Sequence, residues 1–378
     1  MADVHAIAWE CNAKDDRTNI DSCWLVNSDH LYFNLGTQSY AEGRKYWASL
    51  SLASRNLARL IWVHIPEREG ELGKDDLLAK LSAMNLIVAF AVALKHKLRF
   101  EPYVQYDDLS GLVNHLDTFA RAADEPGLTD ISPKSPWKRI GEYLGISFAE
   151  SNPRKLFKKA KKPLGNMPLE ILTYLSTYVE SKVADGAIKV PLASQFLLAI
   201  ATMTEIQTGT ERVVNTPLPV AYSIVISQVM WIYVLVLPFQ LFTYLEWITI
   251  PASIGKTLHD GSNSSGDRIT LTVLTVAAYI ILSLGVIGQE IENPFGHDVN
   301  DLPLDVYCQD ISTEIEILTA LAPPKPTDFI PHDANQVLFP LSTDSHSTWS
   351  QRSVEDIRSA LKARAILSRR GPVEMDDD

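Results

Sequence analysis

Two long stretches without charged residues dominate the pattern of hydrophobic and polar positions along the chain. Residues 213–245 contain no Asp, Glu, Lys, Arg or His, and a second uncharged run covers residues 269–289. An α-helix needs about 20 apolar residues to cross the hydrocarbon core of a bilayer. We therefore predict two transmembrane helices, at 219–245 and 270–288, with an inserted polar loop at 255–268. The alternative is a pair of buried core helices, which seldom stay free of charge over such lengths.

The rest of the chain shows the period of amphipathic helices and almost no strand alternation. Residues 39–212 are predicted to form a cytoplasmic helical domain. Its expected helices cover residues 44–64, 75–97, 107–123, 168–183 and 192–213. The apolar stretch Met84–Leu94 is too short to span a bilayer and is expected to be a buried helix. Residues 1–38 lack a clear period and are expected to be an atypical, poorly structured segment.

Two further regions follow the predicted membrane hairpin. Residues 290–320 are expected to form an acidic loop and a cytoplasmic helix, and residues 321–378 a disordered tail with a short helix at 353–370. Ser353 and Asp356 have the spacing of a capping box at the start of that helix. The predicted class is therefore all-α, with a membrane helical hairpin joined to a cytoplasmic helical domain.

The placement of lysine and arginine predicts the orientation in the membrane. Residues 154–162, RKLFKKAKK, precede the first apolar run, and cationic segments stay on the cytoplasmic side. Residues 40–212 and both termini are therefore expected in the cytoplasm, with the chain in the plasma membrane or an endomembrane. The basic run is either a solvated helix face or a site of attraction to anionic lipid headgroups. Residues 1–30 show no apolar core of a signal peptide.

Composition and motifs exclude several classes of protein. A net charge of −12 argues against a general nucleic-acid binder, which needs a basic surface. Cys11, Cys23 and Cys308 lie far apart, so neither a disulfide framework nor a cysteine zinc site is expected. No Gly-x-Ser-x-Gly, phosphate-binding loop or His-Glu-x-x-His occurs. We therefore expect no enzyme.

A short acidic stretch follows the second apolar run. It contains Glu290, Asn293, Asp298 and Asp301, and Asp305 lies shortly downstream. Hard cations such as calcium take six to eight oxygen ligands, and this stretch is rich in carboxylate and amide oxygens. The alternative is that the acids cap the following helix, with Asp301 or Asp305 near its N-terminus.

Three blocks of sequence together resemble one known family. They are residues 39–59, 216–239 and 290–305, the last followed by Cys308. The third block is the most specific, because an unbroken Asn-Pro-Phe-Gly precedes spaced acids directly after an apolar run. The sequence is similar to the bestrophin-like anion channels, and to their fungal branch in particular. The resemblance covers roughly residues 39–318, with an interruption near 255–272.

The resemblance implies a function and an assembly. It implies a subunit of a chloride or small-anion channel, assembled as a homopentamer around a pore in the lipid bilayer, with the second membrane helix of the family lining a hydrophobic neck. It also implies a possible calcium loop, in which Asp298 and Asp301 match the acidic positions and Glu290 and Asn293 are further candidate ligands.

The sequence departs from the family pattern in two places. The first two membrane helices are expected before Tyr40, yet residues 1–39 contain no candidate, and the loop at 255–268 interrupts the entry into the last helix. An alternative function is therefore a non-conducting membrane scaffold or regulatory paralogue, or a truncated gene model. Glu42, Arg44 and Arg59 either form cytoplasmic ion pairs or coat an anion vestibule.

Overall fold

Helices make up every regular element in the described part of the chain. The computed structural model describes residues 17–101, 106–122, 165–215, 224–225, 227–236, 276, 278–280, 282–283, 293–297 and 300–369. The predicted all-α class is thereby confirmed. The predicted loop at 255–268 and the basic run at 154–162 lie outside the described residues.

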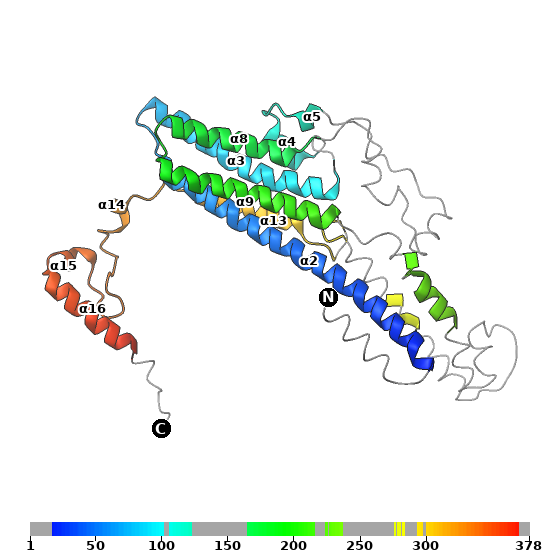
Figure 1. Cartoon of the computed structure of the whole chain (residues 1–378). Coiled ribbons are helices and arrows are strands. Elements are labelled where there is room, and N and C mark those ends of the chain that lie inside the picture. Colours follow the sequence, from blue (N-terminus) through cyan, green and yellow to red (C-terminus); the bar gives the residue numbers. More distant parts are fainter. Residues whose placement is uncertain are drawn as a thin grey trace, which may run out of the picture.

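The longest helix, α2, spans Arg17–His64 and runs along the whole bundle (Figure 1). We predicted a helix only at 44–64 and a poorly structured segment over 1–38, so the prediction is wrong for residues 17–38. The spacing of apolar residues shows only which face of a helix is buried, so a helix without a buried face has no such spacing. Extending a helix that has already begun is easy where no breaker interrupts it, and residues 17–64 contain no proline.

The central helix of the bundle is α3, Glu71–Arg99. Among the described helices it alone is long and apolar enough to cross a membrane. Yet 67% of its apolar 18-residue stretch is buried within the protein. Ile87, Phe90 and Leu94 are fully inaccessible to solvent. A helix that is apolar on all sides and covered by its neighbours belongs to a core. The stretch Met84–Leu94 is therefore a buried helix, as predicted.

Two consecutive helices cover α3 and α2. Helix α8, Met167–Ala184, packs on α3, and α9, Val190–Asn215, packs on both α8 and α2 (Figure 1). The turn between them contains Gly186 with φ of 73°, a left-handed conformation that glycine adopts without steric cost. Both helices were predicted.

The expected single helix at 107–123 is two short helices instead, α4, Asp107–Val113, and α5, Phe119–Ala122. The reason lies in contacts made by the intervening backbone. Tyr174 Oη donates a hydrogen bond of 2.7 Å to the carbonyl of Asp117, and Glu170 accepts from the amides of Phe119 and Ala120. Side chains of α8 thus take up backbone groups that a continuous helix would have paired internally.

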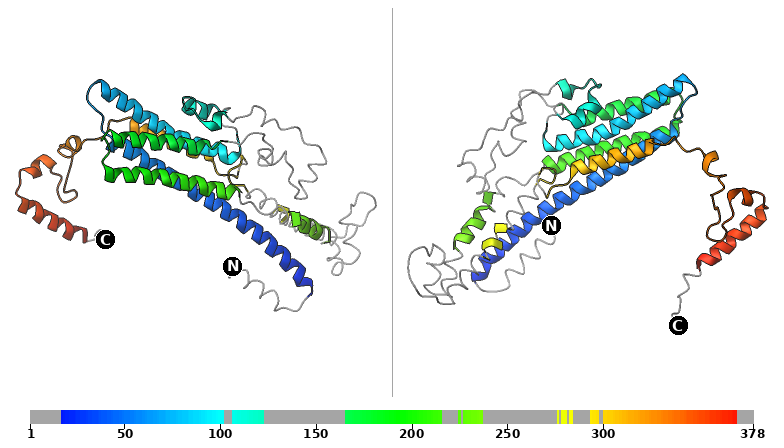
Figure 2. Two further views of the ribbon diagram at one scale, coloured as in Figure 1. Left: turned by 45° about the horizontal axis from the view of Figure 1, so that its top comes forward. Right: turned by 180° about the vertical axis from the view of Figure 1, so that it is seen from behind.

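Helix α13, Leu304–Thr319, packs against both α2 and α3. In the rear view of Figure 2 it lies alongside α2, in the layer between α2 and α3. The rings of Trp47 and Tyr307 lie 6.1 Å apart and join α2 to α13. Residues far apart in sequence therefore share one hydrophobic core.

Only parts of the two predicted membrane helices are described. Ser227–Val236 is a short apolar helix, and residues 276, 278–280 and 282–283 are helical. Ile232 is 60% exposed, Leu235 65% and Tyr279 73%. Large apolar side chains exposed to this degree are expected where a helix faces lipid or another subunit.

The C-terminal region lies beyond one end of the bundle and carries α14, Pro326–Phe329, α15, His346–Ser350, and α16, Val354–Arg369 (Figures 1 and 2). The short helix predicted at 353–370 is confirmed, and so is a capping contact between Ser353 and Asp356 at its start. The Asp356 amide donates 3.2 Å to Ser353 Oγ, and this hydroxyl donates 2.8 Å to the Asp356 carboxylate.

Candidate functional site

The Asn-Pro-Phe-Gly loop is fixed against the bundle by a buried aromatic ring. The Phe295 side chain is fully buried. Its Cζ atom lies 3.0 Å from the place that a Cβ at Gly43 would occupy, and Leu302 Cδ1 lies 3.1 Å from the same place. The amide of Leu302 donates a 2.9 Å hydrogen bond to the carbonyl of Pro294, which closes the loop before α13 begins. Two blocks of the resemblance, Glu42-Gly43-Arg44 and Asn-Pro-Phe-Gly, therefore contact each other.

The structure describes two of the four candidate calcium ligands. Asn293 and Asp301 both point toward Gly296, since a Cβ there would meet Asp301 Oδ2 at 2.5 Å and Asn293 Nδ2 at 3.3 Å. Glu290 and Asp298 lie outside the described residues. Within the described ranges no group of three or more His, Cys, Asp or Glu side chains is arranged to hold a metal ion. Two ligands fall short of the six to eight oxygens that calcium takes, so the calcium loop stays a prediction.

Asp305 occupies the first turn of α13, where a negative charge interacts favourably with the helix dipole. It is not the N-cap, which is Pro303 and makes no side-chain capping bond. Its carboxylate instead accepts 2.8 Å from Lys95 Nζ and 2.9 Å from Arg99, both at the end of α3. Partial burial would raise the pKa of Asp305, but these hydrogen bonds outweigh burial and lower the pKa to about 2.

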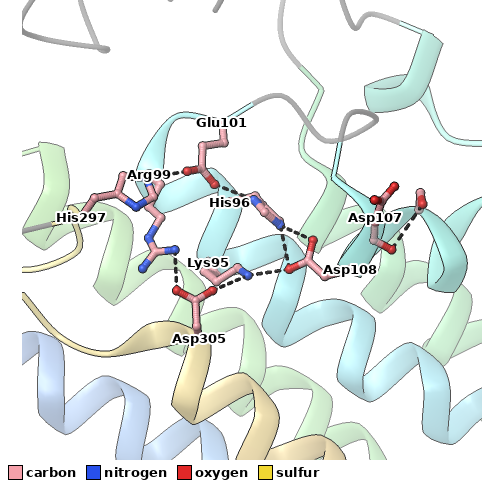
Figure 3. A network of polar contacts seen from close by, with 9 residues as sticks. Lys95, His96, Arg99, Glu101, Asp107, Asp108, His297 and Asp305 are labelled. Carbon is pink, nitrogen blue, oxygen red and sulfur yellow. Dashed lines mark hydrogen bonds and ion pairs between the residues drawn. The ribbon is translucent and has the colours of Figure 1, made fainter.

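Lys95 connects α13 to α4. Its ammonium is almost inaccessible and donates to Asp108 at 2.6 Å as well as to Asp305 (Figure 3). Burial opposes the charged form of Lys95, but the two carboxylates outweigh burial and raise its pKa. A buried ammonium that contacts two carboxylates links the helices firmly, because removing either carboxylate would weaken the compensation of a buried charge and cost stability.

His96 lies between two carboxylates at the centre of this cluster (Figure 3). Its Nδ1 is 2.6 Å from Glu101 and its Nε2 is 3.0 Å from Asp108. An ionised carboxylate only accepts hydrogen bonds, so each ring nitrogen of His96 faces an acceptor. The second oxygen of Glu101 lies 2.6 Å from Nε2 of His297, in the Asn-Pro-Phe-Gly loop. Burial would raise the pKa of Glu101, but the two histidines lower it.

The ion pairs of this cluster hold helices together and do not form a catalytic site. Its carboxylates are engaged by Lys95, Arg99 or a histidine, which leaves no general base among them. Burial raises the pKa of the neighbouring Cys308 thiol to about 12, so it is no nucleophile at neutral pH. What the cluster does is join the end of α3, the start of α4, the Asn-Pro-Phe-Gly loop and α13.

Most of this cluster was not predicted from the sequence. His96 has no metal-ligand spacing, and neither it nor Lys95 or Arg99 was predicted to belong to a site. The available signal was the dense run Lys95–Glu101, KHKLRFE, at the end of an apolar helix and shortly before Asp107-Asp108. Basic residues at the C-terminal end of a helix interact favourably with the helix dipole. The dipole alone therefore accounts for this run, and the sequence does not show which carboxylates pair with it.

Glu42, Arg44 and Arg59, the candidates for an anion vestibule, do not form a common cluster. Glu42 lies 3.4 Å from Arg212 of α9, which confirms the ion-pair alternative for this residue. Arg44 and Arg59 are exposed on α2 and have no ion pair with any other residue that the structure describes.

Comparison with known proteins identifies the family. A profile described as Bacterial/Fungal Bestrophin protein matches residues 37–255 and 264–317, and the break falls inside the predicted loop at 255–268. A protein of Synechocystis sp. named voltage-dependent anion channel-forming protein is 30% identical over 290 residues, which cover 77% of this chain and 73% of the relative. A similarly named protein of Escherichia coli, YneE, is 25% identical over 289 residues, covering 75% of this chain and 69% of that one.

A solved structure shares the fold. The crystal structure of a bacterial bestrophin homologue from Klebsiella pneumoniae has a TM-score of 0.54 at 19% identity, covering 80% of this chain and 86% of the homologue. The profile match extends over most of the chain, and the Synechocystis relative is 30% identical over 77% of it. This chain therefore belongs to the bestrophin family.

Proposed function

We propose that this chain is a subunit of an anion channel. The observation that carries the proposal is the likeness, over 77% of the chain, to a relative named as an anion channel-forming protein. The chain is a bestrophin and thus a membrane protein. The exposed apolar side chains of Ser227–Val236 agree with a helix in contact with lipid or with other subunits.

The conduction path runs between subunits. Within the described bundle α2, α3, α8, α9 and α13 share one hydrophobic core, in which side chains such as Trp47, Phe90 and Phe196 are fully or almost fully buried. Ions need water or polar ligands along their whole path, which such a core does not offer. Several copies around a common axis supply that path, and a homopentamer is the assembly that the family resemblance implies. The pore lies in a lipid bilayer, with the bundle and both termini on the cytoplasmic side.

Chloride is the proposed ion and calcium a proposed ligand of the loop. Calcium is supported by the convergence of Asn293 and Asp301 on Gly296 and by the close contact of this loop with α2 through Phe295. A bound cation there would neutralise carboxylate charge and hold the loop in place. Membership of the fungal branch remains a prediction from the three sequence blocks.

The decisive experiment is reconstitution in planar bilayers. Two preparations are compared: the 378-residue chain, and the same chain carrying upstream of Tyr40 a helix pair from a relative. Under a tenfold KCl gradient, an anion channel gives a reversal potential near the chloride equilibrium potential. Current only from the second preparation would place the neck upstream of Tyr40, as the resemblance implies. Bilayer insertion without current from either preparation would support the scaffold alternative and contradict the channel.

A further inference from the structure

The outer face of α2 carries charges of one sign. Helices α9, α13 and α3 pack on α2, whose buried residues Leu50, Leu57 and Ile61 lie on the opposite side. On the side of α2 that is exposed among the described residues, the exposed charged residues between 41 and 63 are all basic. They are Arg44, Lys45, Arg55 and Arg59, called here the basic stripe. The chain as a whole carries a net charge of −12, so a face without an exposed acid departs from the average surface.

The basic stripe is continuous along the helix. At 100° per residue, its four members fall within roughly 100° of the helix circumference, and Arg44 and Arg59 are about 22 Å apart along the axis. Exposed Ala48 and Leu52 lie between them on the same side. The geometry is that of an extended track and not of a single binding site.

Most of the stripe is unpaired within the described residues. Arg55 is the exception, since its guanidinium contacts the Glu314 carboxylate of α13 through two bonds of 2.5 and 2.6 Å. Arg44, Lys45 and Arg59 have no ion pair with any residue in the described part of the chain. A helix face that serves only for solubility usually carries both signs, because mixed charges avoid self-repulsion. An unpaired row of one sign instead creates a field that concentrates small anions.

We propose that the basic stripe lines the aqueous path of the permeating anion, and that Arg44 and Arg59 set its preference for anions over cations. The inference rests on the proposed channel function and adds the residues that select the ion. Exposed guanidinium groups keep their water, so they attract an anion without binding it tightly, and a conducted ion must be able to leave. Salt screens such a field, so selectivity should decline as ionic strength rises.

The first test is the permeability ratio in the conducting preparation. The variant R44Q/R59Q is compared with R358Q/K362Q, which removes the same charge from the exposed face of α16. We expect the ratio of chloride to potassium permeability to fall roughly 3- to 10-fold in the first variant and to stay unchanged in the second. Equal ratios in all three proteins would overturn the proposal.

A second test does not depend on current and therefore separates this inference from the channel function. A fluorophore is attached through Ala48→Cys in a C11S/C23S background, while Cys308 is buried and left in place. Iodide should quench it more strongly than caesium, and R44Q/R59Q should reduce the iodide quenching in the assembled protein. Equal quenching with and without the two arginines would overturn the proposal. A loss of the oligomer on size exclusion would overturn it too, since the stripe would then face an acidic surface of another copy.

Discussion

The ring of Phe295 lies against Gly43, with its Cζ atom 3.0 Å from the position of a Cβ at residue 43. This contact joins the Asn-Pro-Phe-Gly loop to α2 across most of the sequence. Phe295 and Leu302, the two side chains nearest to that position, are both buried. A glycine is therefore required here by the close approach of two segments.

We expect Gly43→Ala to destabilise the protein by about 1–2 kcal/mol, because overpacking a filled core forces its neighbours to shift. The matched control is Gly111→Ala, in helix α4, where an added Cβ meets nothing within 4 Å. That change should be neutral or stabilising by up to about 1 kcal/mol. Melting temperatures of the two detergent-purified variants measure the difference. A drop of equal size in both would show that the loop yields easily.

A buried ammonium near the start of α3 allows a test of asymmetry between ion-pair partners. Lys80 is 1% exposed and donates to Glu67 at 2.8 Å. Glu67→Gln leaves this buried charge without a charged partner, and we expect a loss of about 1–3 kcal/mol. Lys80→Met removes the buried charge itself and should be neutral or stabilising. Urea midpoints of the two variants decide the point, and a larger loss from Lys80→Met would contradict it.

The stability of the bundle should fall in acid partly through Asp305. Its pKa is lowered from 3.8 to about 2, so its contribution is fully present above pH 3.8 and is lost as the pH falls toward 2. Asp305→Asn should therefore lower the melting temperature at pH 5 and flatten its decline between pH 4 and pH 2. The control is Asp310→Asn, on the exposed side of the same helix. If the melting temperature of Asp305→Asn declined in acid as it does in the unmodified protein, the ion pairs of Asp305 with Lys95 and Arg99 would add nothing to stability.

The predicted membrane hairpin should tolerate removal of the residues that the family profile skips. These are residues 256–263, between its two matched segments. We expect their deletion to leave insertion intact, with the chain retained in membranes after carbonate washing and eluting as a single peak in detergent. Release of the full-length chain by carbonate would argue against both membrane helices, and aggregation of the deletion variant alone would show that the loop packs on something specific.

The sequence by itself determined the helical class, because apolar residues at helical spacing leave few alternatives. It also determined the buried nature of Met84–Leu94 and the capped helix of the tail, since both follow from local length and local chemistry. The length of α2 did not follow, because residues 17–38 carry no period even though nothing in them breaks a helix. The break between α4 and α5 depends on Tyr174 and Glu170, which come from a distant helix.

Only the tertiary structure decided the site. Asp305 was predicted only as a loop acid or a helix cap, because Lys95, its partner, lies 210 residues away along the chain. The contact of Phe295 with Gly43 is equally invisible to local patterns, although each residue lies in a block that marks the family. Helix period and charge runs report on a helix and its surroundings, whereas long-range ion pairs form only after the helices have packed. The basic stripe belongs to both levels: its residues are plain in the sequence, but only packing shows that they share one exposed face of α2 over residues 41–63 of the described chain.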